Sequence, residues 1–560
     1  MLRQLVWRSF AVLLLLPATA FAANEPAPER AAIASAHPLA TEAGLAILEQ
    51  GGNAFDAAVG VSAALAVVEP YSSGVGGGGF WLLHFAAEDR NVFVDGREVA
   101  PRAATRDMYL DDAGEPVPRL SLDGPLAAGI PGHPAALAHI ARKYGRLPLG
   151  DSLAPAIRLA DEGFRADERL IEGIGVKREL LSRWPSAAEV FLDNGAVPEQ
   201  GAIIRQPELA DTLRLLAAEG RDGFYGGTVA KRLIDGVRAN GGIWSPEDLQ
   251  GYRVIEREPL QATYRGVHIT TAPPPSSGGV ALIEMLNILS GYDLSELEPA
   301  TRKHVIVESM RRAYRDRGEF LGDPDFVDMP LRRLLHPFYA AGLRNSIRLD
   351  RATPSATLPG ILTAGAKGTQ TTHFSVLDAD GNQVAATMSI NFWFGSGFMP
   401  EGTGVLLNNE MNDFSVKPGV PDGYQLVGGD ANAIAPGKRM LSSMTPTILE
   451  SDEGMVILGT PGGSRIISMV LLGALAWIDG ASAEQMVSLP RFHHQYQPDR
   501  ISFEPGALSA GAQQALRAMG HELTPVEEPY GNMNVVTWDL DTGEVEAASD
   551  PRGVGEGMVY

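Results

Sequence analysis

The sequence predicts a layered α/β protein whose sheets take strands from both halves of the chain. Strand patterns lie at residues 80–85 and 91–95 and again from residue 371 onward, whereas residues 125–344 are helical in pattern. Strands at both ends of a chain with helices between them indicate sheets covered by helical layers. The 560 residues, 45% of them hydrophobic and 20% charged, are enough for a large core.

The first elements are two helices. Residues 39–48 carry apolar side chains at helical spacing. Asn53 can cap a second helix over residues 54–68, which is rich in alanine and apolar on nearly every side, so we expect it to be buried. The glycine run at residues 74–79 contains G-x-G-x-x-G, but it follows a helix and opens a strand. This is the reverse of a dinucleotide fingerprint, so we expect no dinucleotide site.

Helical patterns fill the middle of the chain, and a loop follows them. The clearest helices are expected at residues 135–144, 152–162, 209–219 and 301–320. Residues 356–370 form a low-complexity stretch of Ala, Gly, Thr and Leu, which predicts a loop where a break in the chain would be tolerated.

A hairpin begins where this loop ends. Residues 373–377 and 384–390 read as two strands, and the Asp380-Gly381 pair between them supplies the turn. Thr371 therefore stands just before a strand. Threonine is a good strand former, so a role for Thr371 beyond structure depends on other features of the sequence.

Composition and the first residues restrict the partners. A net charge of −22 argues against nucleic acids and anionic membrane surfaces. Residues 1–22 have a basic start, a short apolar run and small residues before the expected cut after Ala22, which predicts a secretory signal. The run is too short for an ordinary spanning helix, which disfavours the alternative of an uncleaved anchor. We expect an exported, periplasmic protein.

Residue types restrict the chemistry. The chain has no cysteine, which excludes disulfides, a thiol nucleophile and Cys-ligated metals. Adjacent His493 and His494 point apart and have no carboxylate at ligand spacing, so we expect no metal site there. A hydrolase triad is not supported either, because no G-x-S-x-G nucleophile elbow occurs.

Three polar clusters in the last third of the chain indicate a different kind of site. Residues 407–414 form a dense block of donors and acceptors, residues 439–446 hold two adjacent serines in an otherwise mostly apolar turn, and residues 459–465 hold paired glycines. Paired glycines can present two backbone N–H groups to an anion. A hydroxyl nucleophile without a histidine base can work if it belongs to an N-terminal threonine, whose α-amine, with a pKa of about 8, accepts the proton. This requires a break before Thr371.

Over nearly all of the mature sequence, the chain resembles the γ-glutamyltranspeptidases (glutathione hydrolases), which are N-terminal-nucleophile hydrolases. The motifs that carry the resemblance are residues 51–58, 74–80, 97–101, 371–373, 407–414, 428–433, 441–444, 461–465 and 490–494. The resemblance implies an α/β fold, a four-layer αββα sandwich of two subunits from one precursor. After removal of residues 1–22, residues 23–370 would form the large subunit and residues 371–560 the small catalytic subunit of one core.

The resemblance also implies the reaction. The precursor would cut itself between Gln370 and Thr371, and Thr371 Oγ would attack the γ-glutamyl amide of glutathione or a similar compound. The glutamyl group would pass to water, an amino acid or a peptide, without metal or cofactor. The implied roles are oxyanion binding by Gly462 and Gly463, support of the Thr371 amine by Ser389, α-carboxylate binding by Arg97, Ser442 and Ser443, α-ammonium binding by Asn391, Glu410 and Asp413, and a lid over residues 417–429 that includes Tyr424.

Two departures from the family pattern bear on specificity. Position 389 is serine where threonine is frequent, and residues 392–394 (Phe-Trp-Phe) are bulkier than usual, which could reshape the pocket. One alternative is a glutaryl or cephalosporin amide acylase on the same scaffold. The lid and the ammonium-binding Glu410 and Asp413 count against it, because a glutaryl group has no ammonium. A second alternative is a non-enzymatic binding protein that never matures.

Overall fold

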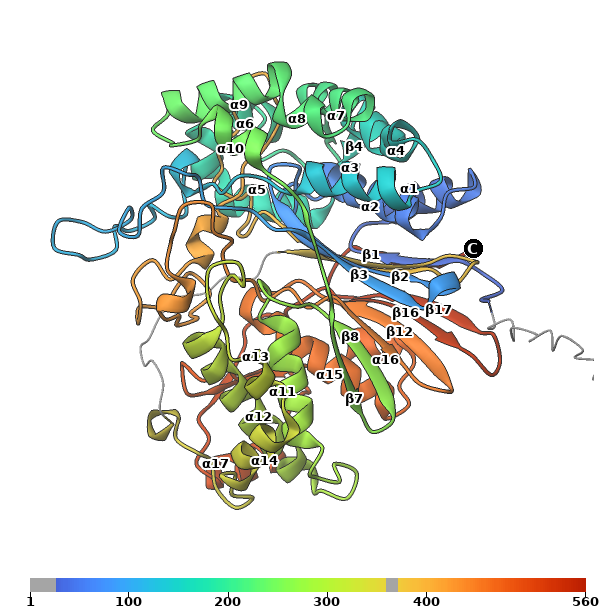
Figure 1. Cartoon of the computed structure of the whole chain (residues 1–560), viewed down its shortest axis with the longest axis vertical. Helices are drawn as coiled ribbons and strands as arrows, with labels where there is room; N and C mark the ends of the chain where they lie inside the picture. Colours follow the sequence, from blue (N-terminus) through green and yellow to red (C-terminus); the bar gives the residue numbers. More distant parts are fainter. Residues whose placement is uncertain (1–26, 359–370) are drawn as a thin grey trace, which may run out of the picture.

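The computed structural model describes residues 27–358 and 371–560, so the predicted leader and Gln370 lie outside the described residues. Two sheets lie face to face between two layers of helices (Figure 1). This is the four-layer αββα arrangement expected from the sequence. Both sheets contain strands from before and after the predicted cleavage point.

The first sheet has seven antiparallel strands. In order across the sheet they are β18 (Glu556–Val559), β1 (Ala32–Ser35), β9 (Thr372–Leu377), β10 (Gln383–Ser389), β2 (Gly78–Phe85), β3 (Arg90–Gly96) and β6 (Ile255–Arg257). β9 and β10 form the predicted hairpin at the centre of the sheet, and Gly381 in its turn has a φ of +85°. β9 is therefore paired on both sides by strands of the same sheet.

The second sheet corrects part of the sequence prediction. Its six antiparallel strands are β17 (Val545–Ser549), β16 (Asn534–Asp539), β12 (Gly454–Gly459), β11 (Thr447–Glu450), β8 (Val267–Thr271) and β7 (Leu260–Tyr264). β7 and β8 come from the part of the chain that we expected to be helical, and there the expectation is wrong. Arg265 and Gly266 join them with φ values of +51° and +85°, a two-residue hairpin turn that the sequence signals only weakly.

One helical layer covers the outer face of the first sheet (Figure 1). It contains α1 (Pro38–Glu49), α2 (Ala54–Val68), α3 (His133–Tyr144), α4 (Leu149–Glu162) and α7 (Pro207–Glu219), close to the bounds expected from the sequence. Side chains alternate along a strand, so β2 serves two cores. Trp81 and Leu83 pack with this helical layer, whereas Phe80 and Leu82 pack in the core shared with the second sheet.

The predicted cap of α2 forms and connects both halves of the chain. Asn53 Oδ1 accepts from the Phe55 and Asp56 backbone N–H groups, and the Asp56 carboxylate accepts from the Asn53 N–H, which completes a capping box. The next N–H, that of Ala54, donates to Asp378 in the β9–β10 turn at 2.8 Å. The start of this buried helix thus holds the turn of the central hairpin.

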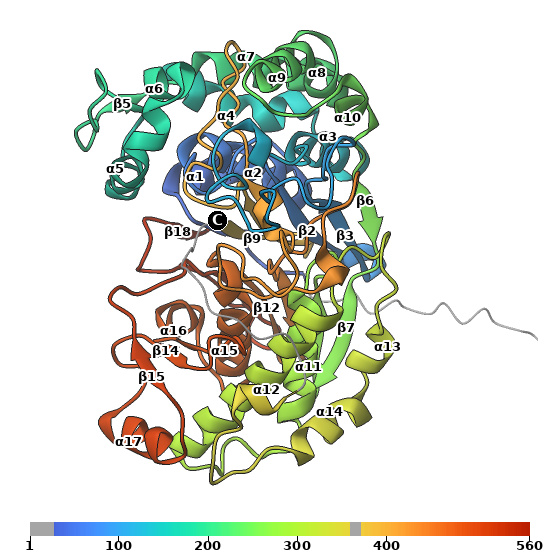
Figure 2. The same cartoon turned by 90° about the vertical axis from the view of Figure 1, so that its left-hand side faces the viewer.

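The other helical layer packs against the second sheet (Figure 2). It contains α11 (Gly278–Leu289), α12 (Pro299–Phe320), α15 (Ile466–Ile478) and α16 (Ala483–Ser488). The remaining helices and strands are α5 (Glu168–Ser182), α6 (Pro185–Phe191), α8 (Arg221–Tyr225), α9 (Gly227–Ala239), α10 (Pro246–Gly251), α13 (Leu331–Leu334), α14 (Pro337–Asn345), α17 (Ala510–Ala518), β4 (Phe164–Arg165), β5 (Ile203–Ile204), β13 (Phe492–His493), β14 (Ile501–Phe503) and β15 (Leu523–Pro525).

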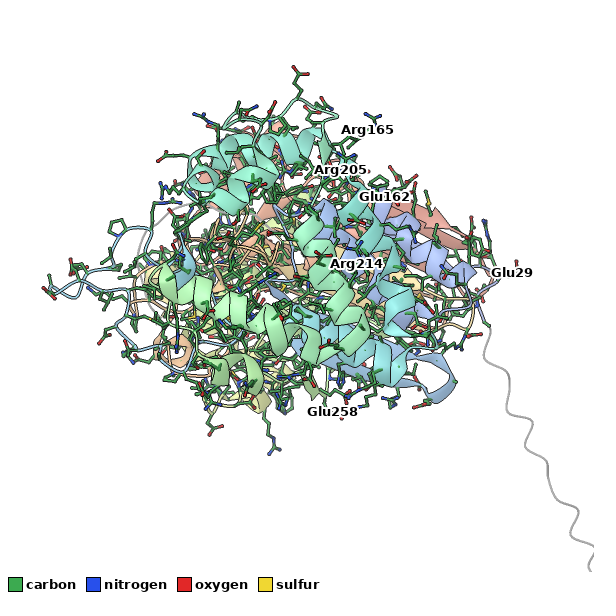
Figure 3. The ribbon with its side chains drawn as sticks, turned by 90° about the horizontal axis from the view of Figure 1, so that it is seen from above. Glu29, Glu162, Arg165, Arg205, Arg214 and Glu258 are labelled. Carbon is green, nitrogen blue, oxygen red and sulfur yellow. The ribbon has the colours of Figure 1, made fainter. Side chains whose placement is uncertain are left out.

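The outer surface of the first helical layer carries charges of both signs. Glu162, Arg165, Arg205 and Arg214 are all exposed there (Figure 3). Arg205 Nε donates to the Glu162 backbone carbonyl at 3.1 Å, and Arg214 pairs with Asp161 at 2.6 Å. Because these side chains are exposed, this face is a solvated surface. Ion pairs on such a surface add little stability. Within the described ranges, no helix is both long enough and apolar enough to span a bilayer.

Candidate active site

A narrow cavity of about 20 Å³ brings together residues from distant parts of the chain. All the predicted site residues in the described ranges line it, except Gly462. The lining residues are Arg97, Arg317, Thr371, Ser389, Asn391, Glu410, Asp413, Asp422, Tyr424, Leu426, Leu441, Ser442, Ser443, Met444, Gly463 and Ile466. They come from strand ends, loops and the helices α12 and α15, so the fold brings the whole set together.

Thr371 immediately precedes the central strand β9, and 6% of its surface is exposed. Its Oγ is 3.4 Å from the Ser389 Oγ at the end of the neighbouring strand β10. Thr372, the first residue of β9, donates from its hydroxyl to the buried Glu69 carboxylate at 2.6 Å, and Tyr71 donates to the same carboxylate at 3.0 Å. Burial raises the pKa of Glu69. The second threonine thus anchors the strand while the first faces the cavity.

Asn391 connects Ser389 to the lid. Its N–H donates to Ser389 Oγ at 2.7 Å, and its side-chain amide donates to the Asn409 carbonyl at 3.0 Å. Its φ is +74°, a left-handed conformation that asparagine tolerates better than most residues. The Asn391 carbonyl accepts from the Tyr424 hydroxyl at 3.2 Å.

Arg97, just after β3, is surrounded by three carboxylates. Its Nη1 lies 2.8 Å from Glu410 Oε2 and 3.4 Å from Glu98 Oε2, and its Nη2 lies 2.5 Å from Asp413 Oδ2. Its Nε donates to the Met440 carbonyl at 3.2 Å. Burial raises the pKa of Glu98 to about 7 and that of Glu410 well above its usual value. Three carboxyl groups therefore surround one guanidinium at this part of the cavity.

The two serines and the two glycines come from the segments just before β11 and just after β12. Ser442 Oγ accepts from the Met444 N–H at 3.1 Å, and Ser443 Oγ accepts from Arg317 Nη2 at 3.2 Å. Gly462 and Gly463 follow β12 with φ values of +143° and +56°. A Cβ on Gly463 would lie 2.4 Å from the Tyr424 ring, and one on Gly462 would lie 2.5 Å from a methionine methyl group. Both positions require glycine.

Tyr424 covers the cavity from the loop that we expected to be a lid. Its ring stacks on Phe392, with centroids 4.6 Å apart and an interplanar angle of 12°. Asp422 fixes the turn of the loop because its carboxylate accepts from the N–H groups of Tyr424 and Leu426 at 2.8 and 3.0 Å. Burial, together with the nearby Asp413, raises the pKa of Asp422 to about 7.

The aromatic run after Asn391 does not line the cavity. Phe392 supports Tyr424, Trp393 packs on Tyr71 and under the Arg169 guanidinium, and Phe394 is fully buried. These bulky side chains therefore act on the site only through the lid and the surrounding core.

Sequence reasoning missed Arg317 and Asp422 as cavity residues. Arg317 occupies the helix face that also carries Met310, Ala313 and Tyr314, all buried. An arginine at helical spacing with apolar residues is the signal that could have identified it, because an unpaired charge on a buried face requires a reason.

The histidine pair has structural contacts. His493 bonds Ser468 at 2.7 Å and Gln495 at 2.8 Å, and burial lowers its pKa to about 3. A carboxylate does lie near the pair, because His494 is 3.2 Å from Asp499. Among the described residues, however, neither histidine belongs to a group of three possible metal ligands.

One other group could offer three metal ligands within the described ranges: His304, Glu308 and His521. Glu308 is already paired with Arg311 and Arg312. Two guanidinium cations at this position disfavour a bound metal cation.

Comparisons with known proteins agree on one family. The family model described as gamma-glutamyltranspeptidase matches residues 40–560. The chain is 43% identical to a glutathione hydrolase proenzyme of Pseudomonas sp. (strain A14) over 500 residues, which cover 88% of this chain and 86% of the relative. It is 41% identical to the glutathione hydrolase proenzyme of Escherichia coli (strain K12), with 94% and 90% of the two chains covered.

A solved structure matches almost the whole chain as well. The cephalosporin acylase from Bacillus halodurans superimposes with a TM-score of 0.83 and 28% identity, and the match covers 98% of this chain and 99% of the acylase.

Proposed function

This chain belongs to the γ-glutamyltranspeptidase family, and we propose that it is an autoprocessed γ-glutamyltransferase and glutathione hydrolase whose nucleophile is Thr371. The observation that carries the proposal is the cavity at the start of β9. There one threonine faces a guanidinium with its carboxylates, a serine pair and a glycine turn.

Maturation comes first in this proposal. Cleavage between Gln370 and Thr371 would leave residues 23–370 as the large subunit and residues 371–560 as the small one. β9 and β10 of the small subunit pair with β1 and β2 of the large one, so the two chains would remain one core after the cut. The new α-amine of Thr371 supplies the base that its hydroxyl otherwise lacks.

The reaction then takes two acyl transfers. Thr371 Oγ attacks the γ-glutamyl carbonyl carbon while the α-amine takes the hydroxyl proton. The N–H groups of Gly462 and Gly463 would hold the oxyanion, and removal of one such donor typically costs about 3 kcal/mol of barrier. The proton passes to the leaving amine as the amide bond breaks, which leaves a glutamyl ester on Thr371. Water or an acceptor amine attacks this ester and restores the threonine.

Binding of the donor uses both ends of the cavity. Asn391, Glu410 and Asp413 would take the α-ammonium, and Arg97, Ser442 and Ser443 would take the α-carboxylate. Ser389, 3.4 Å from Thr371 Oγ, would support the nucleophile, and Tyr424 would close over the bound donor. We also propose export, with residues 1–22 as a leader and the periplasm as the destination.

The test combines protein chemistry with kinetics. Intact-mass analysis with N-terminal sequencing is expected to give two chains, one of them beginning Thr-Thr-His-Phe. The processed protein should release p-nitroaniline from γ-glutamyl-p-nitroanilide, and Thr371→Ala should remain uncut and inactive. A single uncut wild-type chain, or equal release by the variant, contradicts the proposal and favours a binding protein.

The similarity to a cephalosporin acylase supports a second candidate, a glutaryl or cephalosporin amide acylase. The acidic cluster around Arg97 and the closed Tyr424 loop favour a donor that carries an ammonium. The acylase would instead process glutaryl-7-aminocephalosporanic acid faster than glutathione, so the ratio of the two values of kcat/KM decides between the candidates.

A further inference from the structure

Arg317 is a cavity residue whose positive charge the proposed function leaves unused. It projects from the last turns of α12, and 5% of its surface is exposed. Its Nε donates to Ser277 Oγ at 2.9 Å and its Nη2 to Ser443 Oγ at 3.2 Å. Among the hydrogen bonds of the described residues, none involves Nη1. Two hydroxyls therefore orient the guanidinium beside Ser443 and leave one of its nitrogens available.

The two guanidiniums of the cavity differ in their charge balance. Arg97 has three carboxylates within 4 Å and donates its Nε to a backbone carbonyl. Within the described part of the chain, Arg317 forms no ion pair within that distance, and its two hydrogen-bond partners are neutral hydroxyls. The carboxyl groups of Asp422 and Asp413 act on it only from farther away. A buried cation without a counterion is unfavourable and is normally paired. An anionic ligand at Ser443 would provide the missing partner.

A γ-glutamyl donor has the complementary pattern of charge. Its α-carbon carries an ammonium and a carboxylate side by side. The carboxylates around Arg97 suit the ammonium, whereas the serine pair with Arg317 suits the carboxylate. A guanidinium binds a carboxylate through two parallel N–H donors, which gives orientation as well as affinity.

We propose that Arg317 is a substrate-binding residue that, together with Ser443, binds the α-carboxylate of the donor and provides a positive charge that no ion pair among the described residues occupies. This inference rests on the proposed function, because it assumes a donor with a carboxylate at the α-carbon. Arg97 then has two tasks, since it holds Glu410 and Asp413 in place for the ammonium and faces the same carboxylate from the other side.

The test compares donors that differ only in the group at the α-carbon. The three p-nitroanilides are γ-glutamyl, glutaryl and 4-aminobutanoyl; the first two carry the carboxylate and the third carries only the ammonium. For Arg317→Met we expect kcat/KM to fall about 10- to 150-fold with the first two donors, the range for a hydrogen bond to a charged group, and to change less than threefold with the third.

Two further variants separate charge from structure. Arg317→Lys keeps the charge but not the paired donors, so its loss with the two carboxylate donors should lie between those of the wild type and Arg317→Met. Lys303→Met removes one positive charge from the same helix about four turns away from Arg317. It should leave the kinetics with all three donors unchanged. N-terminal sequencing of each variant establishes that the chain has been cut before Thr371. If Arg317→Met does not mature, the kcat/KM values of Arg317→Lys and Arg317→Gln with the three donors are compared instead.

The outcomes distinguish this inference from the proposed function. Equal losses with all three donors would mean that Arg317 only supports the fold around Ser443, and unchanged kinetics would mean that it does not bind the donor; either result overturns the inference. An inactive wild-type protein contradicts the proposed function instead. In that case calorimetric titration of glutamate and 4-aminobutanoate into the wild type and Arg317→Met decides, because only glutamate binding should depend on Arg317.

Discussion

The lid gives the most quantitative prediction, because three contacts of Tyr424 hold it closed. The hydroxyl donates to the Asn391 carbonyl at 3.2 Å, the ring stacks on Phe392 at 4.6 Å, and the ring covers Gly463 so closely that no side chain would fit there. Tyr424→Phe removes only the hydroxyl, whereas Tyr424→Ala removes all three contacts.

The expected magnitudes follow from these contacts. A neutral hydrogen bond contributes about 0.5–1.5 kcal/mol, and at 3.2 Å this one belongs to the lower half of that range, so Tyr424→Phe should weaken closure about 2- to 5-fold. The stacked pair adds about 0.5–1.5 kcal/mol, which brings the expected weakening for Tyr424→Ala to about 5- to 70-fold.

Steady-state kinetics with γ-glutamyl-p-nitroanilide provide the assay. A lid that covers bound donor stabilises the donor complex and the transition state alike, so its loss should raise KM by these factors and leave kcat nearly unchanged. Tyr225→Phe is a matched control. Tyr225 is also buried, stacks on Tyr252 with an interplanar angle of 11° and donates its hydroxyl to the Pro131 carbonyl, but it lies outside the cavity lining.

Two results would refute the reasoning. If Tyr424→Phe and Tyr424→Ala keep the wild-type KM, Tyr424 does not close over the donor. If Tyr225→Phe raises KM as much as Tyr424→Phe does, the effect is general destabilisation. A double-mutant cycle with Phe392→Leu should give a coupling of about 0.5–1.5 kcal/mol between the two rings.

Two other predictions concern pH and maturation. The raised pKa of Asp422, about 7, means that closing the lid binds a proton: the resulting stabilisation is complete below its usual value near 4 and is lost as the pH rises to about 7. Asp422→Asn keeps an acceptor for both backbone N–H groups but cannot lose a proton. The ratio of the wild-type KM to the Asp422→Asn KM should therefore rise from pH 5 to 7 and then stay level. A ratio that does not change with pH would contradict this. Thr372→Val leaves the buried Glu69 carboxylate with Tyr71 as its hydroxyl donor and should slow maturation roughly tenfold in a time course of precursor mass, whereas Thr372→Ser should mature at the wild-type rate.

Local signals explain the elements that the sequence predicted correctly. The cap at Asn53 and the apolar run after it specify α2, and Gly381 specifies the turn of the central hairpin. β7 and β8 were missed because each has only five residues and lies between helical patterns. The turn Arg265-Gly266 also lacks the usual Asn or Asp of a two-residue hairpin.

The site could be predicted only in part, for a physical reason. Motifs in the sequence named the residues, but the ion pairs among them join segments hundreds of positions apart, as between Arg97 and Asp413. Patterns of sequence spacing describe neighbours along one helix or strand, so they cannot predict a contact between such distant segments. Nor does the sequence show that Arg97 has three carboxylates within 4 Å, whereas Arg317 forms no ion pair among the described residues. The separate task proposed for Arg317 rests on this difference.

The position of the two adjacent threonines follows from the sheet. β9 pairs with β1 on one side and with β10 on the other. Thr372 donates its hydroxyl to Glu69, the residue that follows helix α2. A cut before Thr371 would therefore create a free amine without releasing the strand that carries it. An N-terminal nucleophile needs this combination, because its base moves with its backbone: the amine stays beside the hydroxyl only if the first residue of the new chain is held as firmly as an internal one. Thr371 would supply the reacting atoms, and Thr372 would keep them in place.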